Sequence, residues 1–118
     1  MAHQIQIESK GILRLTFIGD TDRQGAAKLL EEFQPFLEQV TAETPWLILW
    51  DDTRGGKASV DVRKVYAQLN RDPRIGKVAI FGANRYGRVL GEFVLKLTGR
   101  DNIRFFGSEA EARGWLTA

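Results

Sequence analysis

Two short apolar runs constrain the fold of this chain more than any other feature of its sequence. The stretches "WLILW" (46–50) and "KVAIFG" (77–82) are apolar without alternation, a pattern typical of strands covered on both faces. Each run is followed by a segment whose apolar residues recur at helical spacing, at 59–70 and at 85–98. Because strands that alternate with helices connect through right-handed crossovers, this order predicts a mostly parallel sheet.

The rest of the chain completes the order β-β-α-β-α-β-α-β-α. Two alternating segments, "QIQIE" and "ILRLTFI", predict an opening hairpin around "SKG" (9–11), in which Gly11 supplies a positive φ. A first helix is expected within 19–40, a last strand at "IRFFG" and a closing helix at "SEAEARGWL". We therefore expect an α/β fold in a single domain over residues 1–118. Its sheet should be five-stranded and mostly parallel, with an opening antiparallel hairpin and four helices.

Capping residues and one proline predict where two of the helices begin and end. Thr21 and Gln24 have capping-box spacing at the start of the first helix. Pro35 should kink or split that helix, because an interior proline costs about 3 kcal/mol. Ser108 and Glu111 repeat the capping-box spacing before the last helix.

The helix at 85–98 combines an apolar stripe with two glycines. Asn84 is expected as its N-cap and Gly99 as its end. The stripe comprises Tyr86, Val89, Leu90, Phe93, Val94 and Leu97. Gly87 and Gly91 leave a bare patch on this helix, at a cost near 1 kcal/mol each relative to alanine. The patch indicates close approach by another backbone, a ligand or a second subunit, or else a tolerated local bend, and we favour the bend.

The composition excludes several classes of protein. There is no cysteine, so disulfides and thiolate metal sites are unavailable. The start, "MAHQIQIESK", lacks the apolar core of a signal peptide, and no segment approaches the ~20 apolar residues that span a bilayer. We therefore expect no membrane span and a cytoplasmic location.

Charge is divided unevenly between the two halves of the chain. Residues 1–58 contain six basic and nine acidic side chains, whereas residues 59–118 contain eleven and six. A basic second half can attract phosphates or an acidic partner through its long-range field. Its basic residues are scattered singly and no aromatic stripe is interleaved with them, so we expect no nucleic-acid binding.

The best candidate site follows the first apolar run. Loops at the C-terminal ends of strands form the usual ligand crevice of an open α/β sheet, and residues 51–57 lie in such a loop. Its candidates for binding a partner are Asp51, Asp52, Thr53, Arg54 and Lys57. The simplest interpretation is that Asp51 bonds loop amides while Asp52 faces water. Gly55 and Gly56 would supply turn dihedrals that a Cβ forbids.

Metal binding and triad catalysis are both disfavoured. Paired carboxylates at Asp51 and Asp52 could hold Mg²⁺ for phosphoryl chemistry. Such a site usually needs a third acid and a lysine at other strand ends, where this chain has glycine, alanine and serine at 82–83 and 107–108. His3 is the only histidine and lies near a terminus, so a nucleophile has no base within the fold. We expect no metal, no cofactor and no enzymatic activity.

The element order, the stretch "LILWDDTRGG" and the ending "IRFFGSEAEARGWL" together resemble the STAS superfamily, in particular its SpoIIAA-like branch. That family typically ends in a strand of basic-apolar-Phe pattern and a short helix of the form E-A-x-x-W-L. Residues 104–106 match the strand, and Glu111, Ala112, Trp115 and Leu116 match the helix. The resemblance implies a bacterial α/β domain used for regulation or protein binding rather than catalysis.

The resemblance also implies a partner and a modification. In anti-sigma-factor antagonists of this superfamily, a partner kinase phosphorylates a serine in an Asp-Ser-Ser-Gly context, at the start of the helix after the third strand. This chain has "KASVD" there, which makes Ser59 the candidate phosphoacceptor although the Asp-Ser-Ser-Gly string is absent. An ordinary N-cap role for Ser59 is the alternative. The implied partner is an anti-sigma-type kinase or another regulator, and a homodimer stays open.

A second function is implied by members of the superfamily that resemble lipid-carrying SEC14 domains. In that case a small hydrophobic ligand would bind between the helices and the sheet, with the helix at 85–98 as its cover. Tyr86, Leu90 and Phe93 are the candidate contacts.

Overall fold

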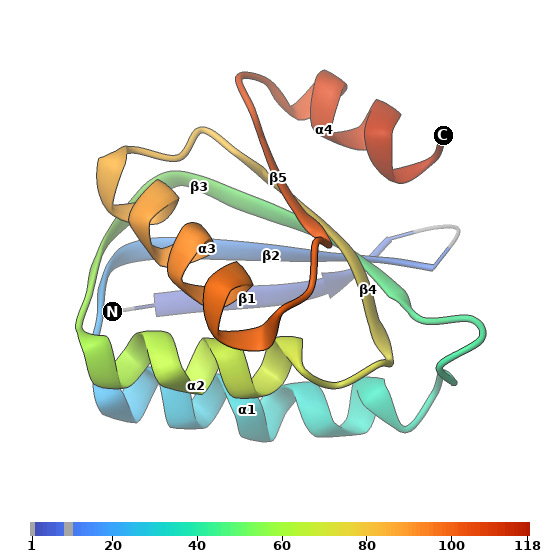
Figure 1. Cartoon of the computed structure of the whole chain (residues 1–118), viewed down its shortest axis with the longest axis horizontal. Helices are drawn as coiled ribbons and strands as arrows, with labels where there is room; N and C mark the ends of the chain where they lie inside the picture. Colours follow the sequence, from blue (N-terminus) through green and yellow to red (C-terminus); the bar gives the residue numbers. More distant parts are fainter. Residues whose placement is uncertain (1, 9–10) are drawn as a thin grey trace.

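A computed structural model describes residues 2–8 and 11–118 of the chain as one five-stranded sheet with four helices (Figure 1). The strands are β1 (Ala2–Ile7), β2 (Ile12–Thr21), β3 (Trp46–Ala58), β4 (Ile75–Phe81) and β5 (Ile103–Phe106). The helices are α1 (Arg23–Leu37), α2 (Val60–Asn70), α3 (Arg85–Thr98) and α4 (Glu109–Leu116). None of these helices combines the length and the apolar composition that crossing a membrane requires.

The predicted fold is confirmed. The strands lie in sequential order. β1 is antiparallel to β2, and the remaining three neighbouring pairs are parallel. The turn predicted at Ser9 and Lys10 lies outside the described residues, but Gly11 has the expected positive φ, 74°.

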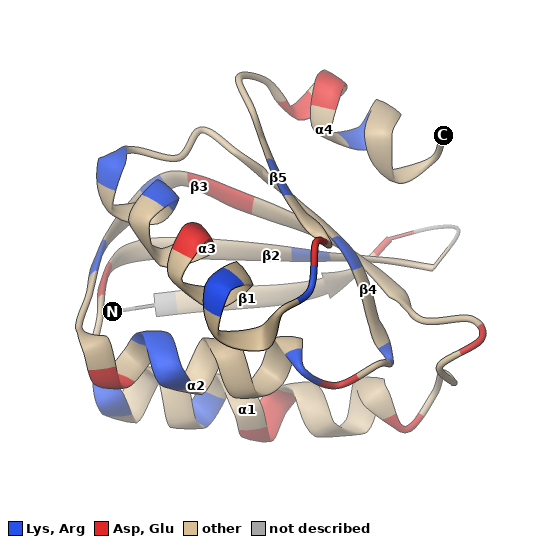
Figure 2. Ribbon diagram, viewed as in Figure 1, with Lys and Arg blue, Asp and Glu red and all other residues tan. Residues whose placement is uncertain are grey.

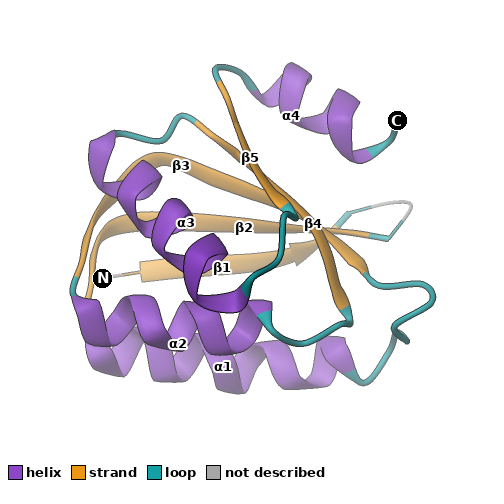
Figure 3. Cartoon of the chain, viewed as in Figure 1, coloured by secondary structure: helices purple, strands orange, loops and turns teal. Residues whose placement is uncertain are grey.

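The sheet separates two apolar layers of unequal size. Right-handed crossovers that advance in one direction place α1, α2 and α3 on the same face (Figure 3). The residues that α1–α3 bury against that face are Ala26, Leu29, Phe33, Leu37, Val62, Tyr66, Ala67, Leu90 and Val94. On the other face α4 packs alone, with Ala112 and Leu116 in the smaller apolar cluster.

The two layers explain why the run at 46–50 does not alternate. Ile48 and Trp50 point into the α1–α3 layer, whereas Leu47 and Leu49 point into the α4 layer. Because both faces of β3 are covered here, both sets of side chains are apolar.

Two details of α1 differ from the sequence prediction. Its N-cap is Asp22 rather than Thr21, with Asp22 Oδ1 accepting a hydrogen bond from Gly25 N at 2.7 Å. Thr21 still belongs to β2, so the helix begins one residue later than the capping box suggested. Pro35 does not split the helix. It lies in the last turn, two residues before the helix ends at Leu37.

The other predicted helix ends are confirmed. Asn84 Oδ1 accepts from two backbone N–H groups in the first turn of α3, at 3.0 and 3.1 Å. Gly99 ends α3 in the left-handed conformation, with φ 70°. Ser108 Oγ accepts from Glu111 N at 3.2 Å and begins α4.

Candidate functional site

The candidate residues at 51–57 lie on an extended strand rather than in a loop. β3 continues to Ala58, whereas its register with β4 ends at Asp51. Beyond that point β3 pairs with the end of β2, where Thr21 lies opposite Ala58. The loop prediction was wrong because β2 is long enough to pair the backbone of this segment. We call residues 52–58 the β3 arm.

Asp51 points toward the α4 face and is fully engaged there. Its Oδ2 accepts a hydrogen bond from Arg14 Nη2 at 2.8 Å. Its Oδ1 accepts from Thr53 N at 3.0 Å and from Thr53 Oγ1 at 2.6 Å. Burial alone would raise the pKa of Asp51, but these donors outweigh it and hold the pKa below its usual value. The prediction that Asp51 bonds a backbone amide is confirmed.

A chain of ion pairs leads from Asp51 to α4. Arg14 Nη1 lies 3.0 Å from Glu109 Oε1. Glu109 Oε2 in turn lies 2.8 Å from Arg113 Nε, and Arg113 donates to both carboxylate oxygens of Glu8, at 2.6 and 2.9 Å. The network therefore links β2, β3 and Glu8, which follows β1, to α4, and its centre, Arg14, was missed in the sequence. The signal for it was a basic residue between buried apolar positions of the strand beside β3.

Asp52 points to the opposite face and is buried, with 5% of its surface exposed. Two glycines make room for its carboxyl group, since a Cβ on either Gly55 or Gly87 would overlap a carboxyl oxygen. Within the described part of the chain, neither Asp52 Oδ2 nor Trp50 Nε1 has a hydrogen-bond partner. The prediction that Asp52 faces water was wrong, because every second residue of β3 faces the α1–α3 layer and Asp52 follows Trp50 on that side.

Asp52 lies near Trp50 and Tyr66, and its burial there changes its titration. The ring centroid of Trp50 lies 4.7 Å from that of Phe17 and 5.7 Å from that of Tyr66. Burial raises the pKa of Asp52 to about 6; the nearby indole N–H of Trp50 opposes this rise and the charge of Asp51 adds to it. Burial also raises the pKa of Tyr66. Asp52 is therefore a carboxyl group whose pKa lies well above its usual value.

The bare patch on α3 is a contact surface. Gly87, Leu90, Gly91 and Val94 form the buried face of the helix. Gly87 meets the Asp52 carboxyl group, and a Cβ on Gly91 would overlap the ring of Phe105. The favoured interpretation of a tolerated bend was therefore wrong, and the close approach comes from side chains of the same chain.

The predicted stripe on the same helix was only half right. Leu90 and Val94 are buried, but Val89 is 47% exposed and Leu97 42% exposed. Because the glycines allow their own side of α3 to lie against the sheet, the stripe is turned partly toward solvent.

The glycine pair of the β3 arm provides space rather than turn dihedrals. Positive φ angles occur at four glycines, Gly11, Gly19, Gly82 and Gly99, and not at Gly55 or Gly56. A Cβ on Gly56 would overlap Asp20 and the backbone of β2 beside it. The turn prediction for this pair was therefore wrong.

The geometry of the acids bears on the magnesium hypothesis. Asp51 and Asp52 project to opposite faces of β3, so the two carboxylates cannot bind one ion. Across residues 2–8 and 11–118, no three His, Asp or Glu side chains gather closely enough to hold a metal. His3 shares a hydrogen bond of 2.7 Å with Glu32 on α1, on the α1–α3 face.

The exposed candidates follow one another along the β3 arm, which leads into α2. Thr53, Arg54 and Lys57 of the arm are exposed. Ser59 is also exposed and is the N-cap of α2, its Oγ accepting from the N–H of Val62 at 3.4 Å.

A hydrogen bond and a cation–π contact join the arm to α3. Asn84 Nδ2 donates to Gly55 O at 3.3 Å, and Lys57 Nζ lies 5.2 Å from the centre of the Tyr86 ring. The structure thus brings Lys57 and Tyr86 together, two residues before Ser59, whereas Thr53 bonds Asp51, which points to the α4 face.

A small cavity lies between the sheet and the three helices. It encloses about 40 Å³, and its walls are almost entirely apolar, with Leu15, Phe33, Trp50 and Val94 among them. Of the three ligand candidates, Leu90 lines this cavity. Tyr86 and Phe93 are half-buried on α3 and are not part of its walls. This volume is well below the ~150 Å³ of an apolar cavity that binds benzene.

The sheet order and the helix placement define an α/β domain of the STAS type. Residues 12–117 match the model of the SpoIIAA-like family, and the chain belongs to that family. No curated protein sequence matches the chain significantly.

Three solved structures are similar to this one over nearly the whole chain. The anti-sigma factor antagonist SpoIIAA in its unphosphorylated form has a TM-score of 0.71 and 12% identity, covering 99% of both chains. An uncharacterised Shewanella loihica PV-4 protein with a SpoIIAA-like fold has a TM-score of 0.70 and 19% identity, covering 98% of this chain and 92% of the other. The phosphorylated form of the Bacillus cell fate determinant SpoIIAA has a TM-score of 0.60 and 13% identity, covering 98% and 99%. At these identities the likeness shows the fold alone.

Proposed function

We propose that this chain is a single, non-catalytic regulatory domain that binds a protein partner, as anti-sigma-factor antagonists do, in the cytoplasm of a bacterial cell. The observation that carries the proposal is that the exposed arm residues Thr53, Arg54 and Lys57 lead directly into the exposed N-cap Ser59. Asp52 lies beneath the arm, against Gly87 of α3, and Asp51 fixes Thr53 from the opposite face, so both would set the shape of the arm. Arg14 and Thr53 occupy the carboxylate of Asp51, and burial encloses that of Asp52, so neither is presented to a substrate.

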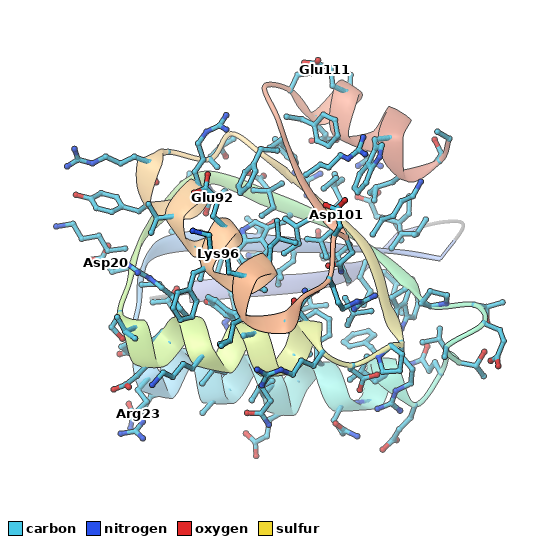
Figure 4. The ribbon with its side chains drawn as sticks, viewed as in Figure 1. Asp20, Arg23, Glu92, Lys96, Asp101 and Glu111 are labelled. Carbon is cyan, nitrogen blue, oxygen red and sulfur yellow. The ribbon has the colours of Figure 1, made fainter. Side chains whose placement is uncertain are left out.

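Capture of a partner from a lysate of the source organism tests this surface. The variant Arg54→Ala/Lys57→Ala should lose the captured partner. The control Arg23→Ala removes an exposed arginine from the start of α1 (Figure 4) and should retain it. Equal capture by all three proteins would show that the partner does not use the β3 arm.

Ser59 is our candidate for regulation of the same surface. SpoIIAA has been solved in unphosphorylated and phosphorylated forms, and Ser59 occupies the start of the helix after the third strand. A phosphate adds about −1.5 to −2 charges at neutral pH and would be stabilised at a helix N-terminus. It would also oppose the positive charge of Arg54 and Lys57. Mass spectrometry of the protein isolated from its own cells should find phosphate on Ser59, and its consistent absence under all growth conditions would reject the switch.

The alternative function, a carrier of small hydrophobic molecules, is favoured by the apolar cavity beneath α3. A ligand larger than a few atoms would require α3 to move away from the sheet. Native mass spectrometry of the purified protein should then reveal a bound apolar mass. A protein that stays free of added mass after incubation with fatty acids would count against this function.

A further inference from the structure

The outer surface of α3 carries a second apolar stripe, which we call the outer stripe: Tyr86, Val89, Phe93 and Leu97. These residues recur at intervals of three and four, so they share one side of the helix. Val89 and Leu97 are two of the four large apolar side chains that are most exposed in the described residues. The stripe extends over three helical turns, about 16 Å at 1.5 Å per residue.

Positive charge borders the Tyr86 end of the outer stripe. Arg85 lies 5.0 Å from the centre of the Tyr86 ring and donates to its hydroxyl oxygen at 3.1 Å. Lys57 lies 5.2 Å from the same ring centre. The backbone of Lys57 is fixed in turn, because its N–H donates to Asp20 Oδ1 at 2.8 Å. Two cations are thus held against one end of the stripe.

Positive charge also borders the Leu97 end. Arg71 Nη2 reaches from the end of α2 and donates to Leu97 O at 3.3 Å. Lys96 is exposed on the last turns of α3 (Figure 4). Figure 2 shows basic residues at both ends of α3 and one acidic residue, Glu92, between them.

Among the residues that the structure describes, none of these four cations forms an ion pair. In the described part of the chain, the ion pairs of Lys and Arg involve Arg14, Arg74 and Arg113. An apolar strip of helical length between unpaired cations complements a helix whose apolar side chains are flanked by carboxylates.

We propose that the outer stripe and its four cations bind an acidic amphipathic helix of a partner protein. The partner's apolar side chains would lie on Val89, Phe93 and Leu97, and its Asp and Glu residues would face the cations at the two ends. This inference rests on the proposed function and specifies the class of partner. It extends the partner surface from the β3 arm along α3.

Selection from a phage-displayed library of 18-residue helical peptides tests the proposal without assuming a partner sequence. Peptides selected on the whole chain should be rich in Asp and Glu, with apolar residues at spacings of three and four. Val89→Glu/Leu97→Glu should weaken the selected peptides at least about tenfold, as expected at central contacts. Lys57→Glu/Arg85→Glu should weaken them similarly and reduce their salt dependence.

Matched controls place the same changes elsewhere. Ile7→Glu replaces another exposed apolar side chain, and Arg23→Glu reverses another exposed charge, so both should bind as the unmodified chain does. Amide shifts of the unmodified protein on peptide addition should map to 85–97 and to Lys57, a readout that does not depend on any variant folding.

Several results would overturn the inference. These are selection of basic or uncharged peptides, failure to select any binder, amide shifts confined to the α4 face, and binding of anionic lipid vesicles without binding of peptides. The proposed function fails separately. If the arm variants lose a captured host partner while Val89→Glu/Leu97→Glu retains it, the regulatory domain stands and the helix-binding stripe does not.

Discussion

Asp51 and Asp52 are neighbours in sequence, yet their carboxyl groups lie on opposite faces of the sheet in contrasting environments. Asp51 accepts hydrogen bonds from Arg14 and Thr53, which lower its pKa. Asp52 is buried beside Trp50, one of its oxygens has no hydrogen-bond partner within the described residues, and burial raises its pKa to about 6. The strand's period of two separates the pair, so each acid affects stability with the opposite dependence on pH.

The first prediction concerns Asp52→Asn. Because the pKa of Asp52 in the folded state is raised above the usual 3.8, its ionised form destabilises the folded protein at pH 8. The free energy of unfolding of the variant should therefore exceed that of the unmodified chain at pH 8, by up to about 3 kcal/mol. As pH falls from about 6 to 4, the stability of the unmodified chain should rise relative to that of the variant, because its carboxyl group becomes protonated in the folded state. Urea denaturation of both proteins between pH 4 and 8 measures this difference.

Asp51→Asn is the control, and its effect on stability should have the opposite sign. Because the pKa of Asp51 is lowered in the folded state, its contribution to stability is present above the usual pKa and is lost only in more acidic solution. The variant should be less stable at pH 7, with no recovery between pH 6 and 5. A parallel pH dependence in the two variants would contradict the assignment of separate environments.

The second prediction concerns the glycine that faces Asp52. Gly87→Ala should lower the free energy of unfolding by about 1–3 kcal/mol, because its Cβ would overlap the Asp52 carboxyl group. Gly114→Ala on α4 is the matched control. Outside its own turn of α4, no atom lies within 4 Å of its added Cβ, so it should stabilise the protein by about 0.5–1 kcal/mol through helix propensity.

The double variant Asp52→Ala/Gly87→Ala isolates the contact. Shortening residue 52 makes room for the new Cβ, so Gly87→Ala should cost less in this background than alone. Thermal denaturation of the four proteins in the cycle gives the coupling. Strict additivity would show that Gly87 is required for a reason other than Asp52.

The fold could be predicted from the sequence because its signals are local and repeat along the chain. Apolar runs without alternation, such as 46–50, indicate that both faces of a strand are buried. The caps Asn84 and Ser108 act within one helical turn. The errors occurred where a distant segment decides the local structure. The arm after Asp51 is extended because the end of β2 pairs with it, and no pattern within 51–57 reveals the length of β2.

The site was predicted less completely, for the same reason. The positions at 51–59 could be found because they follow a buried strand, but the burial of Asp52 depends on Gly87 of α3, far along the chain. Alternation alone would have placed Asp52 on the side of Trp50 if 51–57 had been interpreted as strand. The orientation of α3 could not be derived from the sequence. Either its apolar stripe or its glycine patch could have packed against the sheet.

The third prediction concerns Arg14, which joins Asp51 to Glu109. Its side chain is 19% exposed and that of Asp51 12%, so Arg14→Met should leave a largely buried carboxylate unpaired and destabilise the protein by about 2–4 kcal/mol. The pKa of Asp51 should rise at the same time. Urea denaturation and a carbon-13 titration of the carboxyl groups measure the two effects.

Arg113→Met tests the outer end of the same network. Arg113 and its partner Glu8 are more exposed, at 36% and 24%, so this variant should cost only about 1 kcal/mol, and the cost should shrink in high salt. A larger loss for Arg113→Met than for Arg14→Met would reverse our ranking of the two ion pairs.

The last prediction separates the two roles of Ser59. As the N-cap of α2, its hydroxyl accepts from Val62 N, so Ser59→Ala should lower the free energy of unfolding by about 1 kcal/mol, whereas Ser59→Asp keeps a capping oxygen and the stability. If negative charge here controls partner binding, Ser59→Asp should lose the partner and Ser59→Ala should keep it. Denaturation and partner capture on the same preparations distinguish these outcomes. If partner binding instead changes in parallel with stability, so that Ser59→Ala weakens it and Ser59→Asp leaves it unchanged, Ser59 acts only as a helix cap.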